Sequence, residues 1–109
     1  MPSALKVLGQ VLPAAGTLTA LYTVPSKGQA TCSTLAACNQ GSAPTTIRVS
    51  VAIAGAADAS AQYLFYDVPV AAKDTFSATI GITLAPTDAV RCRSANGQVS
   101  FHLFGEELS

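Results

Sequence analysis

Charged residues are scarce in this chain. Six acidic and six basic residues make 11% of its 109 positions, against about 25% in an ordinary globular protein. The formal net charge is zero, so no overall field attracts nucleic acid or an anionic membrane surface. Half of the residues are hydrophobic, and so few charges cannot cover the surface of a small domain. We therefore expect part of that surface to be buried against other proteins, with nucleic acid excluded as a partner.

Long apolar runs and tryptophan are missing as well. No stretch of about 18 apolar residues occurs, because Thr, Ser and Gly interrupt the hydrophobic segments, so no membrane partner is predicted. Aromatic residues make only 6% of the chain, and no carboxylate-rich loop is present that would hold calcium. The lack of tryptophan, the few aromatic residues and the missing calcium loop weigh against a carbohydrate-binding or adhesin-like β-sandwich. Such a binding module stays as the alternative to a structural protein.

Helical patterns are equally scarce. Glutamate is absent before Glu106, and Leu, Lys and Arg never recur at helical spacing. Val, Ile, Thr, Tyr and Phe dominate in short runs bounded by turn-forming residues, which favours strands. Eight strands are predicted, at residues 5–12, 17–24, 29–38, 45–54, 61–70, 74–84, 88–94 and 98–105. The chain is therefore expected to be a single all-β domain over residues 1–109, an antiparallel β-sandwich or jelly-roll-like barrel, with residues 1–16 as an extended arm or the first strand.

Alternation along the predicted strands indicates which side chains face the core. The run TTIRVSVAI predicts that four alternate residues are buried, namely Ile47, Val49, Val51 and Ile53. In residues 74–84 the apolar side chains fall on one face and the hydroxyl side chains dominate the other. The run YLFY within 61–70 is apolar on both faces, which predicts burial on both sides.

The dipeptide Asn96-Gly97 is the strongest hairpin pattern in the chain. Both residues tolerate a positive φ, which a type I′ turn requires at its two central positions. We therefore expect residues 88–94 and 98–105 to pair as an antiparallel hairpin.

No group of residues points to catalysis. The one histidine, His102, lies in a predicted strand, and no local motif places a nucleophile beside it. Asp67, Asp74 and Asp88 fall in or near turns, where carboxylates commonly cap the backbone. A glycine-rich phosphate loop is absent as well. We therefore expect no enzyme activity, no catalytic residue and no cofactor.

The three cysteines do not have the spacing of a zinc site. Together with His102 they make four possible ligands, but the gaps of six, 54 and ten residues lack the short C-x₂₋₄-C pair typical of small zinc domains. The sequence therefore predicts no metal site.

Cys32 and Cys38 cannot bond to each other within one strand, because about 3.3 Å per residue separates them by roughly 20 Å. On an unbroken strand they share a face, and Cys38 lies at its end, beside a turn. We predict Cys32 to be a reduced core thiol, and Cys38 and Cys92 to be the reactive pair. Those two are expected either to bond within the subunit, closing a loop worth roughly 4 kcal/mol, or to bond to neighbouring proteins. Three unpaired thiols are the alternative.

A succession of short motifs runs through residues 21–108. It consists of YTVP at 22–25, CN at 38–39, YD.P at 66–69, DT at 74–75, GITL at 81–84 and VSFHLFG at 99–105. In this succession the chain resembles a family of small β-rich virion structural proteins of tailed bacteriophages. Thr87 departs from that family, whose members place glycine before the aspartate, so the type of turn there is left open. The resemblance implies a non-enzymatic part of a virus particle and transfers no catalytic residue.

Resemblance and composition together give the expected role. The first expectation is a capsid decoration or cement protein in the virion, assembled in the host bacterial cytoplasm, which binds the major capsid protein. A chain with so little charge is suited to a closed homo-oligomer, and a trimer is the first expectation. The alternative within the same class is a structural component of the neck, tail or baseplate.

Overall fold

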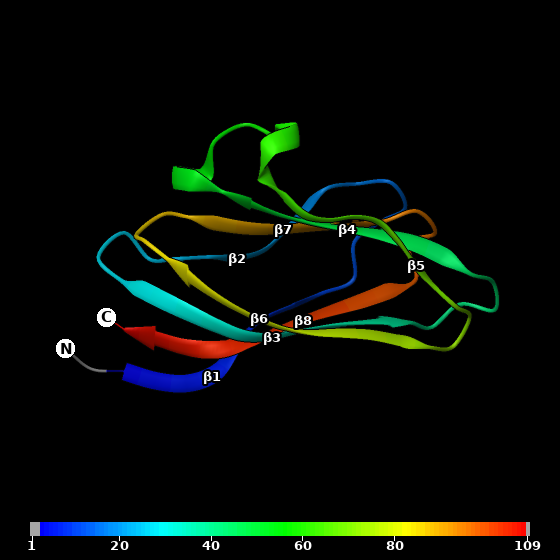
Figure 1. Cartoon of the computed structure of the whole chain (residues 1–109), viewed down its shortest axis with the longest axis horizontal. Helices are drawn as coiled ribbons and strands as arrows, with labels where there is room; N and C mark the ends of the chain where they lie inside the picture. The colour runs from blue at the N-terminus through cyan, green and yellow to red at the C-terminus, as the bar shows by residue number, and fades with distance from the viewer. Residues whose placement is uncertain (1–2, 109) are drawn as a thin grey trace.

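The protein is a sandwich of two four-stranded antiparallel sheets (Figure 1). The structure is a computed structural model that describes residues 3–108. One sheet has the strand order β1-β8-β3-β6 and the other the order β2-β7-β4-β5. The strands are β1 (Ser3–Val11), β2 (Thr19–Thr23), β3 (Gln29–Asn39), β4 (Thr45–Ala52), β5 (Tyr63–Val70), β6 (Thr75–Leu84), β7 (Ala89–Ser94) and β8 (Val99–Leu108). Two single 3₁₀ turns, η1 (Ile53–Gly55) and η2 (Ser60–Gln62), lie between β4 and β5.

This strand order is that of a jelly roll, in which two Greek keys distribute eight strands over two sheets. All eight predicted strands are present, with ends that differ from the prediction by at most three residues, so the all-β sandwich is confirmed. The N-terminal segment forms β1, which pairs with β8 along its length. Residues 1, 2 and 109 of the predicted domain lie outside the described residues.

The core lies between the two sheets. Phe101 and Leu103 of β8 and Leu35 of β3 project from one sheet, and Ile47 and Val49 of β4 project from the other. All five side chains are fully buried, each worth about 1.5–3 kcal/mol relative to an exposed position. The alternation in β4 thus predicted Ile47 and Val49 correctly.

The same alternation was wrong for Ile53, which is 76% exposed. The strand ends at Ala52, and Ala54 takes a positive φ of 54° within the turn η1. The chain then folds back over the outer side of the β4–β7 region, where it stands above the sheet in Figure 1. Ser50 and Ala52, which alternation predicts to be outside, are fully buried beneath it.

The expectation of burial on both sides of residues 61–70 was also wrong. β5 is an edge strand that pairs only with β4, so the outer side of its sheet is open at this position. Leu64 is 45% exposed and Tyr66 is 59% exposed.

The predicted hairpin between residues 88–94 and 98–105 does not form. β7 pairs with β2 and β4, whereas β8 pairs with β1 and β3 in the opposite sheet. Gly97 has a φ of 71°, but Asn96 does not have the positive φ that a type I′ turn requires. Instead, the Asn96 side chain accepts a hydrogen bond from the backbone N–H of Gln98, and the chain crosses from one sheet to the other.

Candidate assembly surfaces

The outer face of the β1-β8-β3-β6 sheet is rich in hydroxyl groups and nearly free of charge. We call it the hydroxyl face, and define it by Thr31, Ser33, Thr34, Thr75, Ser77, Thr79, Thr83 and Ser100. Register places Thr31 beside Glu106, the one charged side chain that projects outward from these four strands over the residues described. Apart from Glu106, such a face can bury its surface against another protein without desolvating a charge.

An apolar stripe borders the hydroxyl face along β1. Leu5 is 84% exposed and Val7 is 48% exposed, and Val7 lies opposite Phe104 of β8. The His102 ring stacks on Phe104 with a centroid distance of 6.3 Å and an interplanar angle of 3°. His102 Nδ1 is 3.2 Å from Gln10 Nε2, so the histidine belongs to a surface cluster of β1 and β8.

The outer face of the β2-β7-β4-β5 sheet carries all three arginines of the chain, Arg48, Arg91 and Arg93. Arg48 binds Asp67 through two hydrogen bonds of 2.6 and 3.1 Å, and its guanidinium lies 4.0 Å above the centre of the Tyr66 ring. The hydrogen bond from Arg48 holds the pKa of Asp67 below its ordinary value. The charges of this face are thus largely engaged within the subunit.

Arg91 of this arginine face holds the loop that covers the sheet. Its guanidinium donates to the backbone carbonyls of Gly55 and Ala56, at 3.0 and 2.7 Å. At the far side of the loop, the buried carboxylate of Asp88 accepts hydrogen bonds from the backbone N–H groups of Ala54 and Ala85, both at 2.9 Å. Asp88 therefore caps the backbone, as the turn pattern predicts.

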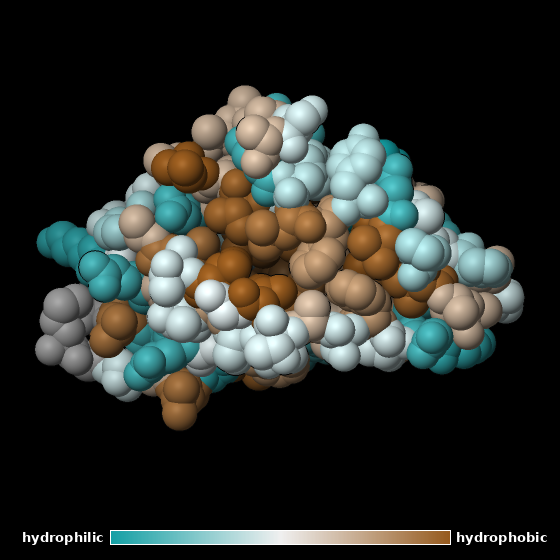
Figure 2. All heavy atoms as spheres, in the orientation of Figure 1, coloured by the Kyte–Doolittle hydropathy of each residue, from teal (hydrophilic) through white to brown (hydrophobic). Residues whose placement is uncertain are grey.

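The sandwich is open along its β5–β6 side, and Figure 2 shows hydrophobic residues gathered in a hollow between the layers. Several hydrophobic side chains of these two edge strands that pack against the core are only half-buried, namely Phe65 and Val68 of β5 and Phe76, Ile80 and Ile82 of β6. The rings of Phe65 and Phe76 meet edge to face across the opening, with centroids 5.2 Å apart. This open edge exposes part of the core.

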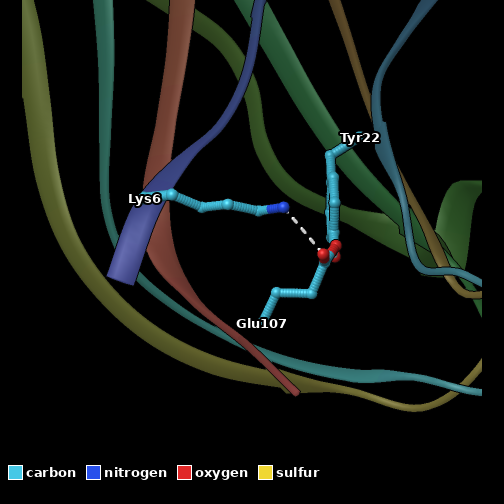
Figure 3. A network of polar contacts seen from close by, with 3 residues as sticks. All are labelled: Lys6, Tyr22 and Glu107. Carbon is cyan, nitrogen blue, oxygen red and sulfur yellow. Dashed lines mark hydrogen bonds and ion pairs between the residues drawn. The ribbon is translucent and has the colours of Figure 1, made fainter. Parts of the chain in front are cut away.

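The corner near the two chain ends is closed by a network of three side chains (Figure 3). Lys6 Nζ of β1 is 2.7 Å from Glu107 Oε1 of β8, and the hydroxyl of Tyr22 on β2 donates a short hydrogen bond to the other carboxylate oxygen. Lys6 and Tyr22 hold the pKa of Glu107 below its ordinary value, and burial raises that of the Tyr22 hydroxyl. The network joins the two sheets.

The opposite end of the sandwich is organised by Asn39, whose side chain is fully buried. Its amide nitrogen donates to three backbone carbonyls at 2.9–3.3 Å, those of Ala43, Val70 and Ala71. Its amide oxygen accepts from the backbone of Gly41 and from the side chain of Asn96. A shallow depression of about 420 Å³ lies above this region, lined by Pro44, Thr45, Thr46, Pro69, Ala95 and Asn96. The depression has no charged lining residue, so it offers no group for acid–base chemistry.

The three cysteines are unbonded, and the structure separates them. Cys92 lies in the core between the sheets and is fully buried, as is Cys32. Cys38 is half-buried on the hydroxyl face, where register places it between Thr75 and Ser100. The structure therefore does not bring Cys38 and Cys92 together. Burial raises the pKa of the Cys32 thiol to about 11 and that of Cys92 to about 12, so both stay protonated at neutral pH.

The expectation that Cys32 and Cys38 share a face was wrong. A bulge at Ser33 interrupts the pairing of β3 with β8, so that Cys32 faces Gly105 while Thr34 faces Phe104. Gly105 is needed there, because a Cβ at this position would lie 2.1 Å from the Thr31 carbonyl oxygen. The extra residue reverses the alternation along the rest of β3.

Asn39 and Glu107 matter to the architecture but were not identified as important from sequence. Asn39 does occur in the CN motif at a strand end, where a side-chain amide can bond to a turn, and this pattern could have indicated it. Glu107 faces inward because β8 extends as far as Leu108, where Glu107 pairs with Ala30 of β3. No local sequence pattern reveals this pairing.

Within residues 3–108, no cluster of three potential metal-ligating side chains occurs, and no helix is long and apolar enough to cross a membrane.

No family model matches the chain, and no curated protein matches it in sequence. Seven chains of solved structures do match its structure. One belongs to the acidic stable capsid structure of Helicobacter pylori bacteriophage KHP30, with a TM-score of 0.52 and 16% sequence identity. The match covers 98% of this chain and 87% of that chain. The chain is thus similar in fold, over nearly its whole length, to a chain of a phage capsid structure.

Proposed function

We propose that this protein is a structural component of a bacteriophage virion and that it decorates the capsid. The observation that carries the proposal is the fold match with a chain of a phage capsid structure, which spans 98% of this chain. The match is to the complete sandwich, so the proposal concerns the domain as a whole. The motif succession from YTVP to VSFHLFG supports the same class.

The surfaces are suited to such a role. The hydroxyl face and the apolar stripe of Leu5 and Val7 together offer a broad sheet surface with little charge to desolvate. We assign this surface to contacts with the major capsid protein and with neighbouring copies in a closed oligomer, for which a trimer is the proposed size. The arginine face, whose Arg48 and Arg91 are engaged within the subunit, then faces outward.

Particle composition tests the proposal. Quantitative mass spectrometry of purified virions should find this chain in a copy number comparable with that of the major capsid protein, after assembly in the host cytoplasm. A copy number that is a small fraction of that of the major capsid protein would instead indicate a component of the neck, tail or baseplate. Absence from washed particles would overturn the virion role altogether.

A further inference from the structure

The two sheets end in four edge strands, and three of them carry features that block pairing with another strand. β1 has Lys6 and an irregularity between Val7 and Gly9, and β2 has only five residues. β5 contains Pro69 and the residue Asp67, which has a φ of 55°. Charges, prolines, bulges and shortness are the means by which proteins protect the edges of sheets.

The fourth edge strand, β6, has almost none of these features. It spans ten residues without a charge or a proline, and it pairs only with β3, so its other edge has free backbone donors and acceptors. Exposure alternates along its whole length, with Phe76, Ile80 and Ile82 half-buried on the inner side. Its one irregularity is at Gly81, which has a φ of 55° and lies where the register with β3 shifts, between Thr79 and Ile82. An edge of this kind is a template for another strand.

We propose that β6 pairs antiparallel with β6 of a second copy, about a two-fold axis that passes beside Thr79. A two-fold axis perpendicular to the sheet places inward residues opposite inward residues, so the apolar rows of the two copies join. In this register Thr79 faces its own copy, and four further pairs form: Thr75 with Thr83, Phe76 with Ile82, Ser77 with Gly81 and Ala78 with Ile80. Threonine pairs and pairs of an aromatic with a β-branched residue are favourable neighbours across strands.

The charge distribution supports a second copy of this chain as the partner that pairs with the free edge of β6. No charge lies within the paired segment, so the two copies meet without like-charge repulsion. Asp74 precedes β6, and antiparallel pairing carries the two copies of Asp74 to opposite ends of the contact. The result is one continuous eight-stranded sheet that covers half-exposed apolar side chains of the open edge. The contact is made by the backbone edge of β6, whose outward residues also belong to the hydroxyl face, and it does not depend on the virion role.

A cysteine at the proposed axis tests the register. Residues directly opposite in an antiparallel pair have Cα atoms about 4.5–5.5 Å apart, within the reach of a disulfide. In a Cys38→Ser background, Thr79→Cys should form a covalent dimer on mild oxidation, seen by non-reducing electrophoresis. The matched control is Ser77→Cys on the same exposed side of β6, whose two copies would lie four residues, or about 13 Å, apart. The control should stay monomeric on the gel, and equal cross-linking of both variants, or of neither, would overturn the register.

A charge on the inner side of β6 tests the contact itself. Ile80→Lys places a charge on the open edge, where it stays solvated in the isolated subunit but is buried by strand pairing. The mass measured by light scattering should fall to half of the wild-type value: from a dimer to a monomer or, where the proposed trimer also forms, from a hexamer of two trimers to one trimer. Thr23→Lys on the edge strand β2 is the control and should leave the mass unchanged. A wild-type mass that Ile80→Lys does not alter, with circular dichroism showing a folded variant, contradicts the proposal.

Discussion

Cys32 and Cys38, six residues apart on β3, project to opposite sides of their sheet. Cys32 is sealed in the core, whereas Cys38 reaches the hydroxyl face. The bulge at Ser33 creates this difference, because one extra residue reverses the facing of every later side chain in the strand. Two thiols of one strand therefore have different access to solvent.

This difference predicts the reactivity of the thiols. In the folded protein an alkylating reagent should modify Cys38 first, while Cys32 and Cys92 react only after unfolding, because both are fully buried and burial raises their pKa values. Mass spectrometry of the labelled protein should count one added group in buffer and three in denaturant. Labelling of Cys92 as fast as Cys38 in buffer would show that the core is not closed as described. A bond to a neighbouring protein in the particle, if one forms, is expected at Cys38.

The buried amide of Asn39 predicts a strong effect on stability. Asn39→Ala leaves the carbonyls of Ala43, Val70 and Ala71 without their donor at a fully buried position. We expect the free energy of unfolding to fall by about 2–4 kcal/mol, measured by urea denaturation. The neighbouring Gln40 is exposed, so Gln40→Ala should change it by less than about 0.5 kcal/mol. Equal effects of the two substitutions would contradict the role of Asn39.

The turn before Asp88 predicts a stabilising substitution. Thr87 has a φ of 66°, and this left-handed conformation is costly for a β-branched residue. The turn therefore has a backbone conformation that favours glycine, although threonine occupies the position. Thr87→Gly should raise the free energy of unfolding by about 1 kcal/mol. Thr83→Gly, within β6, should instead lower it by about 0.5–1 kcal/mol. Thermal denaturation compares the two, and a loss of stability with Thr87→Gly would count against the strained turn.

The corner network predicts a dependence on pH. The pKa of Glu107 in the folded protein is lower than the ordinary value of 4.5 that it regains on unfolding. Its contribution to stability is therefore complete above that ordinary value, and it is lost as the pH falls through the lower folded value. Urea denaturation at a series of pH values measures this. The Glu107→Gln variant should have a lower free energy of unfolding than the wild type at pH 6, and that free energy should fall less between pH 6 and pH 3 than it does in the wild type. Parallel curves for the two proteins would exclude a role for this carboxylate.

The strands could be predicted from sequence because their determinants are local. Alternation identified β6, and the Pro, Gly, Asn and Asp residues between the runs bounded all eight strands. Long-range pairing was not accessible in the same way: Asn96-Gly97 favours a hairpin, yet β7 and β8 belong to different sheets. Nor could any local pattern show that the η1–η2 loop folds back over Ser50, or that one extra residue at Ser33 separates the two cysteines of β3.

For the surfaces too, local features could be predicted from sequence, whereas features that depend on long-range strand pairing could not. Low charge predicted a surface for association, and the hydroxyl-rich side of residues 74–84 was visible in the sequence as well. The grouping of all three arginines on the opposite sheet depends on the pairing of β4 with β7, as does the cover over that sheet. The open β5–β6 side appears only when two edge strands from different sheets are placed next to each other.

The most direct test of the central claim is an add-back experiment. Particles assembled in a host that lacks this gene are mixed with the purified protein, and the bound copies are counted by quantitative mass spectrometry after the particles are pelleted. The decoration proposal predicts saturable binding over the whole shell, in a fixed ratio to the major capsid protein, with bound protein seen on the capsid surface by electron microscopy. No binding to intact shells, or binding confined to the tail or to a single vertex, would contradict it.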